Sequence, residues 1–235
     1  MNTFVIAKRE LKAFFVSPIA YIVGAAFLFI TGLFFVFTVT IGNTASFLQV
    51  FNVTSVILLF VAPILTMRLL AEEARSGTLE LLMTAPVRDW EVVLGKFLAT
   101  FVFFIGLLIL TSYFLFLLTW YGNPDILVTL AGYVGIIFLG AMLISLGLLT
   151  SALSDNQIIA AVLGIALSLS FWLAGGLATV FEGPLSQLLA YLSVQEHLGD
   201  FILGLITLAN IVYFLSMTAT ALFLTIRILE VRRWR

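Results

Sequence analysis

The chain alternates between long stretches without a charged residue and short polar segments. The uncharged stretches cover residues 13–67, 97–124, 126–154, 156–181 and 201–226. A helix that crosses a bilayer needs about 20 apolar residues at a rise of about 1.5 Å each. The first stretch has room for two such helices, and a turn signal at Gly42-Asn43-Thr44 divides it. The pattern therefore predicts six spans, over residues 19–41, 48–68, 97–120, 127–150, 157–179 and 202–226.

The composition supports a lipid environment. Of the 235 residues, 63% are hydrophobic and 10% are charged, whereas an ordinary soluble domain is about 45–50% apolar and about 25% charged. A soluble globule of this size cannot hide that much apolar surface, so we expect the lipid bilayer as its surroundings. In the strands of a membrane barrel, apolar and polar residues alternate, whereas these runs are continuously apolar. The expected class is an all-α membrane protein.

The basic residues indicate the orientation. All eleven Lys and Arg residues fall on one side of a six-span arrangement, in the N-terminal segment, the loop after span 2 and the C-terminus. The opposite loops contain acidic residues and no Lys or Arg. Because cytoplasmic loops carry the excess of Lys and Arg, both termini are predicted to be cytoplasmic.

Residues 1–18 have the pattern of an amphipathic helix on the membrane surface. A helical wheel places five apolar side chains within roughly 100° of arc, namely Phe4, Ala7, Leu11, Phe14 and Phe15. The charged residues lie off this arc, with Lys8 at its edge and three residues pointing away: Arg9, Glu10 and Lys12. The alternative is a charged tail without fixed structure.

The loop at residues 68–96 is the largest polar segment, with nine of the chain's 23 charges. Ser76-Gly77 predicts the end of the helix that continues from span 2. A short apolar helix over 78–83 follows, Pro86 stops it, and Asp89 is a candidate N-cap for the next span. Such an apolar helix either folds onto the bilayer or docks in a groove of another protein.

This loop carries a family resemblance. Residues 72–87 read EEARSGTLELLMTAPV and are followed by Leu94-Gly95-Lys96. They resemble the signature loop of ABC-2 type transporter permeases, and the resemblance extends over essentially the whole chain. The chain is most similar to the permease branch associated with gliding motility, through residues 8–12, 17–19 and 122–125.

The resemblance implies a bacterial inner-membrane permease subunit that exports a substrate. An ABC ATP-binding subunit would bind ATP and magnesium, a second permease half would complete the path, and the N-terminal helix would lie on the inner leaflet through Phe4, Lys8, Arg9, Leu11, Lys12 and Phe15. The implied ATPase-coupling residues are Glu73, Arg75, Gly77, Thr78, Leu79, Glu80, Leu81, Leu82 and Pro86. Between spans 5 and 6, residues 178–199 would re-enter the outer leaflet, with a break at Gly183-Pro184 and a short helix over 185–192. The domain division is thus 1–18 for the interfacial helix and 19–235 for the transmembrane domain.

Several motifs and residue types that other functions require are absent from the sequence. No G-x-x-x-x-G-K-[ST] loop occurs, so ATP binding and enzymatic activity are not expected in this chain. With no cysteine and His197 as the single histidine, a metal site is not expected, and His197 is predicted to be a plain polar loop residue. No span carries a charged residue at its centre, which argues against an ion-coupled carrier. No nucleic-acid partner is expected.

Two questions stay open from the sequence. Polar residues inside the spans either bond a neighbouring helix or line a path, and the path-lining candidates are Asn52, Ser55, Ser168 and Asn210. Glu73 and Arg75 either orient the ATPase or pair within the chain, bracing the end of span 2 against the N-terminal helix. The alternative function is a non-transporting membrane scaffold or assembly subunit.

Overall fold

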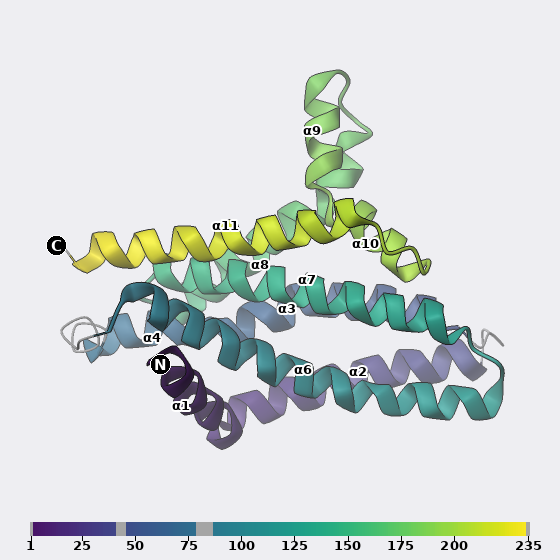
Figure 1. Ribbon diagram of the computed structural model, residues 1–235, viewed down its shortest axis with the longest axis horizontal. Coiled ribbons are helices and arrows are strands. Elements are labelled where there is room, and N and C mark those ends of the chain that lie inside the picture. Colours follow the sequence, from purple (N-terminus) through teal and green to yellow (C-terminus); the bar gives the residue numbers. More distant parts are fainter. Residues whose placement is uncertain (1, 41–45, 79–86, 234–235) are drawn as a thin grey trace.

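The computed structural model describes residues 2–40, 46–78 and 87–233. The regular elements of these residues are helices: α1 (Asn2–Val16), α2 (Pro18–Thr40), α3 (Leu48–Thr66), α4 (Arg68–Ser76), α6 (Asp89–Tyr121), α7 (Ile126–Leu153), α8 (Gln157–Ala178), α9 (Pro184–Leu192), α10 (Val194–Ile202) and α11 (Leu208–Arg233). Six helical stretches are long and apolar enough to cross a membrane, namely α2, α3 with α4, α6, α7, α8 and α11. The predicted all-α, six-span class is confirmed. The end of α11 and the end of α4 lie at the same end of the elongated bundle (Figure 1).

The third span begins earlier than its uncharged stretch. Helix α6 starts at Asp89, and the backbone N–H of Arg88 donates to the side chain of Glu91 at 3.0 Å. Arg88 is therefore the N-cap, and the expectation that Asp89 holds that position is wrong by one residue. The extra turns bring Lys96 into the helix, where it faces α1 and α4.

The predicted start of the sixth span is wrong. Residue 202 ends α10, and α11 begins only at Leu208. Gly204 adopts a φ of 89°, a left-handed conformation that favours glycine, and its backbone N–H returns to the carbonyl of Phe201 at 3.0 Å. An uncharged stretch defines where a span can lie, but it does not reveal a glycine turn inside it.

Helix α7 lies at the centre of the bundle and packs against α3, α6, α8, α10 and α11. Half of its most apolar stretch is buried, a share that only the α3–α4 stretch exceeds among the six candidate spans, at 61%. Its glycines make room for side chains of its neighbours: a Cβ at Gly132 would overlap the ring of Phe51, and one at Gly140 would overlap the ring of Phe104. Small residues allow membrane helices to approach closely, and this explains the central position of α7.

Helix α1 packs along the beginning of α6. Its inner face carries Ile6, Glu10 and Phe14, and the Phe14 ring stacks on Phe103 at 5.2 Å. Phe4 and Phe15 point outward and are 76% and 56% exposed. The amphipathic helix is thus present, but the expectation that Glu10 points away is wrong, because a buried lysine on α6 attracts this carboxylate inward.

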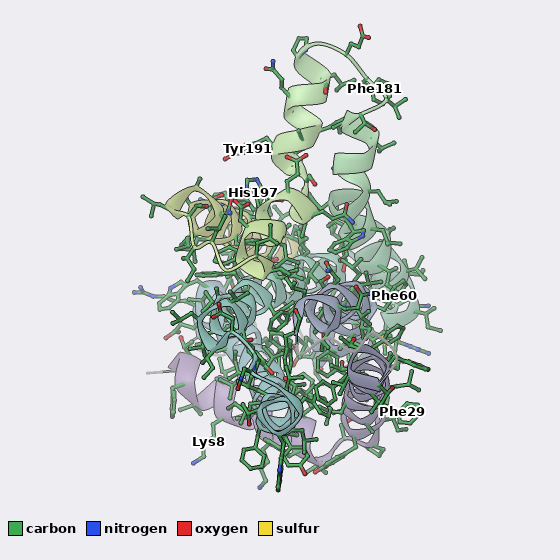
Figure 2. All side chains as sticks on the ribbon, turned by 90° about the vertical axis from the view of Figure 1, so that its right-hand side faces the viewer. Lys8, Phe29, Phe60, Phe181, Tyr191 and His197 are labelled. Atoms are coloured by element: carbon green, nitrogen blue, oxygen red, sulfur yellow. The ribbon has the colours of Figure 1, made fainter. Side chains whose placement is uncertain are left out.

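The end of α8 and the helix α9 form a helical hairpin that projects from the bundle (Figure 1). Gly183, with a φ of 80°, separates α8 from α9, and Pro184 is the first residue of α9. No residue of α9 is fully buried, and Figure 2 shows Phe181 and Tyr191 on this projection. The interruption at Gly183-Pro184 and the short helix behind it are confirmed, while the depth of the hairpin in the membrane stays a prediction.

Candidate functional site

One buried lysine joins three helices at the end of the bundle that contains the 68–96 loop. The Nζ of Lys96 on α6 lies 2.7 Å from Oε1 of Glu73 on α4 and 3.3 Å from Oε1 of Glu10 on α1. Arg9 adds contacts of 2.7 Å to Glu10 and 3.6 Å to Glu73. The Lys96 side chain is only 1% exposed, and a buried charge requires such partners. We call these four residues the ion cluster.

The glycine before Lys96 explains how α1 reaches the ion cluster. A Cβ at Gly95 would lie 2.8 Å from Cγ2 of Ile6 and 3.1 Å from the carbonyl oxygen of Thr3. No ordinary Cβ contact is as short as the first of these, so a side chain here would push α1 away from α6. The Gly-Lys pair therefore has a physical meaning: the glycine admits α1 and the lysine holds it.

Burial and charge act in opposite directions on Glu10. Burial raises the pKa of this carboxyl, because the charged form loses its hydration. The charge of Lys96, together with the hydrogen bond and the charge of Arg9, outweighs burial and holds the pKa of Glu10 below its usual value. Glu10 is therefore ionised at neutral pH.

The helix break between α3 and α4 is closed by a side chain from α7. The backbone N–H groups of Leu70 and Ala71 both donate to Oγ of Ser151 at 3.1 Å. The same hydroxyl donates to the carbonyl oxygen of Met67 at 3.0 Å. Ser151 thus caps α4 from another helix and satisfies N–H groups that a helix start leaves without partners. Through this cap and the ion cluster, α4 is joined to α7, α6 and α1.

A cavity of about 280 Å³ opens beside the ion cluster, between α1, the start of α2 and the α3–α4 junction. Glu10, Glu73 and Lys96 form part of its wall, and apolar residues such as Phe14 and Leu65 form another part. The cavity therefore has an ionic side and an apolar side at the level where α4 leaves the bundle.

The predicted coupling residues divide into two groups. Glu73 faces inward, which confirms for this residue the alternative that it pairs within the chain and braces α4 against α1. Arg75 is exposed, and Gly77 ends α4 with a φ of 71°, as Ser76-Gly77 predicted. The hydroxyl of Thr78 lies 2.8 Å from that of Ser76. The remaining coupling residues lie outside the described part of the chain, namely Leu79, Glu80, Leu81, Leu82 and Pro86. The 78–83 helix therefore stays a prediction.

The four path-lining candidates have different surroundings in the structure. Asn52 is exposed on α3 and donates to the carbonyl of Leu48 at 3.0 Å, and Ser55 is buried and donates to the carbonyl of Asn52 at 2.7 Å. Ser168 on α8 is buried, and its hydroxyl has no hydrogen-bond partner in the described part of the chain. Asn210 belongs to a polar group at the start of α11. Only Asn52 among these four therefore presents an exposed polar group on the side of a span.

Sequence reasoning did not assign site roles to Lys96, Glu10 or Ser151. Lys96 matched the family pattern but stood at the edge of an uncharged stretch, where a lysine normally extends to the membrane surface. A signal was available for Glu10, because it lies four residues from both Ile6 and Phe14 on the inner face of α1. Nothing in the sequence pairs Ser151 with Met67, because their contact depends on how α7 crosses α3.

The comparison with protein families adds an independent finding. Residues 4–231 match the family model described as ABC-2 family transporter protein. The match covers nearly the whole described structure, from α1 to the end of α11. No curated protein matches the chain.

Proposed function

The chain belongs to the ABC-2 transporter family, and we propose that it is the permease subunit of an ABC exporter driven by a separate ATP-binding subunit. Members of the family are multi-pass membrane proteins, in keeping with the six apolar helices. ATP and magnesium would bind to the partner, because this chain has no Walker loop. The proposed location is a bacterial inner membrane with both termini in the cytoplasm.

The observation that carries the proposal is the position of α4. This helix leads directly into the family's signature loop, and it is fixed on its inner side by Lys96 and Ser151. A force applied to the loop would reach α6 and α1 through Lys96 and α7 through Ser151. The helix that follows span 2 is therefore joined to other spans, as a coupling element requires. A scaffold subunit would share the topology but would need no ATPase-docking loop, so the motif at 72–87 counts against it.

The proposed docking residues are Leu79, Leu81 and Leu82, with Glu80 and Arg75 as orienting charges. Burial of one Leu contributes about 1.5–3 kcal/mol, and interfaces concentrate their energy in a few such anchors. We expect Leu81→Asp to abolish co-purification of the ATP-binding subunit, because it places a charge in an apolar groove. The two subunits should be co-expressed, and the bound ATPase and its hydrolysis rate measured.

A matched control is Gln195→Asp. It adds the same charge in the first turn of α10, where a carboxylate is favourable for a helix start and which is proposed to lie on the opposite side of the membrane. This variant should retain the ATPase. If Leu81→Asp also retains it with unchanged hydrolysis, the 78–83 helix is not the docking element and the scaffold function gains support.

The proposed orientation rests on the eleven basic residues and has its own test. Reporter fusions at residues 123 and 195 should lie outside, and a fusion at residue 76 should lie inside. A reversal at any one of the three positions would contradict the six-span topology.

A second permease half, identical or related, is proposed to cover exposed parts of α3 and α8–α9. Asn52 lies on the same outward face of α3 as Val56 and Phe60, each 42% exposed. Asn52 is the fifth residue of α3, and an exposed amide on the side of a span is better placed toward a protein partner or a polar path than toward lipid. Because the chain has no cysteine, Asn52→Cys gives a single thiol, and disulfide cross-linking between two copies would test this face.

The role in gliding motility is a narrower hypothesis, which deletion of the coding sequence would test by a motility assay.

A further inference from the structure

A second polar group lies where α9, α10 and α11 meet, toward the opposite end of the bundle from the ion cluster (Figure 1). The Nδ1 of His197 is 2.8 Å from Oδ1 of Asn210, and its Nε2 is 3.1 Å from the carbonyl oxygen of Tyr191. The Nδ2 of Asn210 donates to Oδ2 of Asp200 at 2.8 Å. Figure 2 shows Tyr191 and His197 where the projecting hairpin joins the bundle. His197 is therefore not the plain loop residue that the sequence predicted.

Counting hydrogens shows what all three contacts require if each is to be a hydrogen bond. The carbonyl of Tyr191 can only accept, so Nε2 of His197 must carry a hydrogen. An ionised Asp200 can only accept, so the amide nitrogen of Asn210 must face it and the amide oxygen must face His197. Nδ1 of His197 then also needs a hydrogen, which makes the ring an imidazolium. Turning the Asn210 amide would require a protonated Asp200 instead, and the number of protons would be the same.

We propose that His197, Asn210 and Asp200 form a proton-operated latch that holds the end of α9 against α10 and α11. The arrangement contains one proton more than a neutral His197 with an ionised Asp200. If that proton leaves, one ring nitrogen presents a lone pair to an oxygen and the contact to Tyr191 or to Asn210 is lost. The latch is therefore favoured as the pH falls and loosens as it rises. Imidazole changes its charge in the range of about pH 5 to 8, where such a latch can respond.

The groups around the His197 ring are aromatic rings and carboxylates. The Tyr213 ring of α11 stacks on His197 with centroids 3.9 Å apart, and the Tyr191 ring of α9 meets its edge at 5.8 Å. Glu196, on the same helix as His197, lies near Gly175 of α8. No Lys or Arg occurs between residues 97 and 226. The titratable groups around the ring are thus two tyrosines and the carboxylates of α10, with no competing cation from this stretch of the sequence.

The latch would act on the hairpin at its hinge. Ser193 separates α9 from α10 in an extended conformation, with φ of −69° and ψ of 115°. The hydroxyl of Tyr213 donates to the carbonyl of Leu192 at 2.8 Å, and this bond does not depend on the state of His197. When the proton is lost and the contact of His197 to Tyr191 breaks, the last turn of α9 is freed while the hinge remains attached. The inference goes beyond the proposed function, since it holds with or without an ATP-binding partner.

The test uses the full-length protein in lipid nanodiscs. Because His197 is the single histidine, ¹⁵N-histidine labelling gives one imidazole whose protonation can be followed directly by NMR. Hydrogen exchange of amides 184–192, corrected for the intrinsic effect of pH, should be about three- to tenfold faster at about pH 8 than at about pH 5.5. Amides in the middle of α7 serve as the internal control and should show no corrected change.

Two variants separate the latch from general loosening. His197→Gln cannot gain a charge, so the pH dependence of exchange in 184–192 should disappear. Asp200→Asn lets the Asn210 amide turn, so a neutral His197 fits and the hairpin should stay protected at both pH values. The proposal is overturned if His197→Gln keeps the wild-type pH response, or if the imidazole is neutral at about pH 5.5 while 184–192 remain protected.

Discussion

The two ends of the bundle hold their helices together with different chemistry. At one end, the buried Lys96 forms salt bridges to Glu73 and Glu10. At the other end, one imidazole and one amide connect Tyr191 to Asp200. The first arrangement is built from salt bridges, whereas the second passes through a histidine ring whose hydrogen-bonding pattern depends on its protonation. The contrast suggests a fixed joint beside the coupling loop and an adjustable joint beside the projecting hairpin.

The largest effect is expected from removing the charge of Lys96, which joins α6 to α1 and α4. Lys96→Met leaves the carboxylates of Glu73 and Glu10 buried without their main partner, and should lower the free energy of unfolding by about 3–5 kcal/mol. The apparent unfolding temperature of the detergent-solubilised protein would report the loss. Arg75→Met removes an exposed charge from the same loop and should change stability little. Equal unfolding temperatures for Lys96→Met and the wild type would show that the ion cluster does not hold α1.

The next effect concerns the close approach of α1 to α6. Gly95→Ala places a methyl group against Ile6 and should destabilise the protein by about 1–3 kcal/mol. A methyl group added at Gly106 on the same helix would point into open space, so Gly106→Ala should be neutral or slightly stabilising through helix propensity. Thermal unfolding of the two variants side by side measures the difference. A destabilised Gly106→Ala with an unaffected Gly95→Ala would contradict the packing of α1.

A smaller loss is expected at the cap between α7 and α4. Ser151→Ala removes the acceptor of two backbone N–H groups and should lower stability by about 1–2 kcal/mol. It should also weaken the coupling between transport and ATP hydrolysis by the partner subunit, because α4 would no longer be fixed to α7. Ser145→Ala is the control, since the hydroxyl of Ser145 is equally buried but bonds only within its own helix. The same loss for both variants would indicate a packing effect and not a cap.

The smallest effect is expected from Glu10 and concerns stability at acidic pH. Because the pKa of Glu10 is lowered in the folded protein, its ion pairs stabilise the structure above the usual carboxyl value of about 4.3. This contribution is lost as the pH falls through the lowered native pKa. Wild-type stability should therefore fall more steeply below about pH 4.3 than that of Glu10→Gln, in unfolding curves recorded from about pH 6 to about pH 3. Parallel curves for the two proteins would exclude this role of Glu10.

The sequence alone predicted the elements that depend on local patterns. The lengths of the uncharged stretches indicated the spans. Gly77 and Gly183 indicated helix ends, because glycine adopts a positive φ without the steric cost that other residues have. The same reasoning placed α11 too early, because the turn at Gly204 lies inside an uncharged stretch. It also placed Glu10 on the wrong side of α1, because apolar side chains on that helix face both the protein and its surroundings.

The tertiary structure decided which polar groups meet. Lys96 and Glu10 are far apart in the sequence, and their contact exists only because Gly95 lets α1 lie against α6. Ser151 caps α4 only because α7 crosses the end of α3 at that residue. His197 differs from a loop histidine only through the positions of Tyr191 and Asn210 on neighbouring helices. Hydrophobicity and backbone preferences act along the chain and are readable in it, whereas the pairing of buried polar groups depends on where the helices cross.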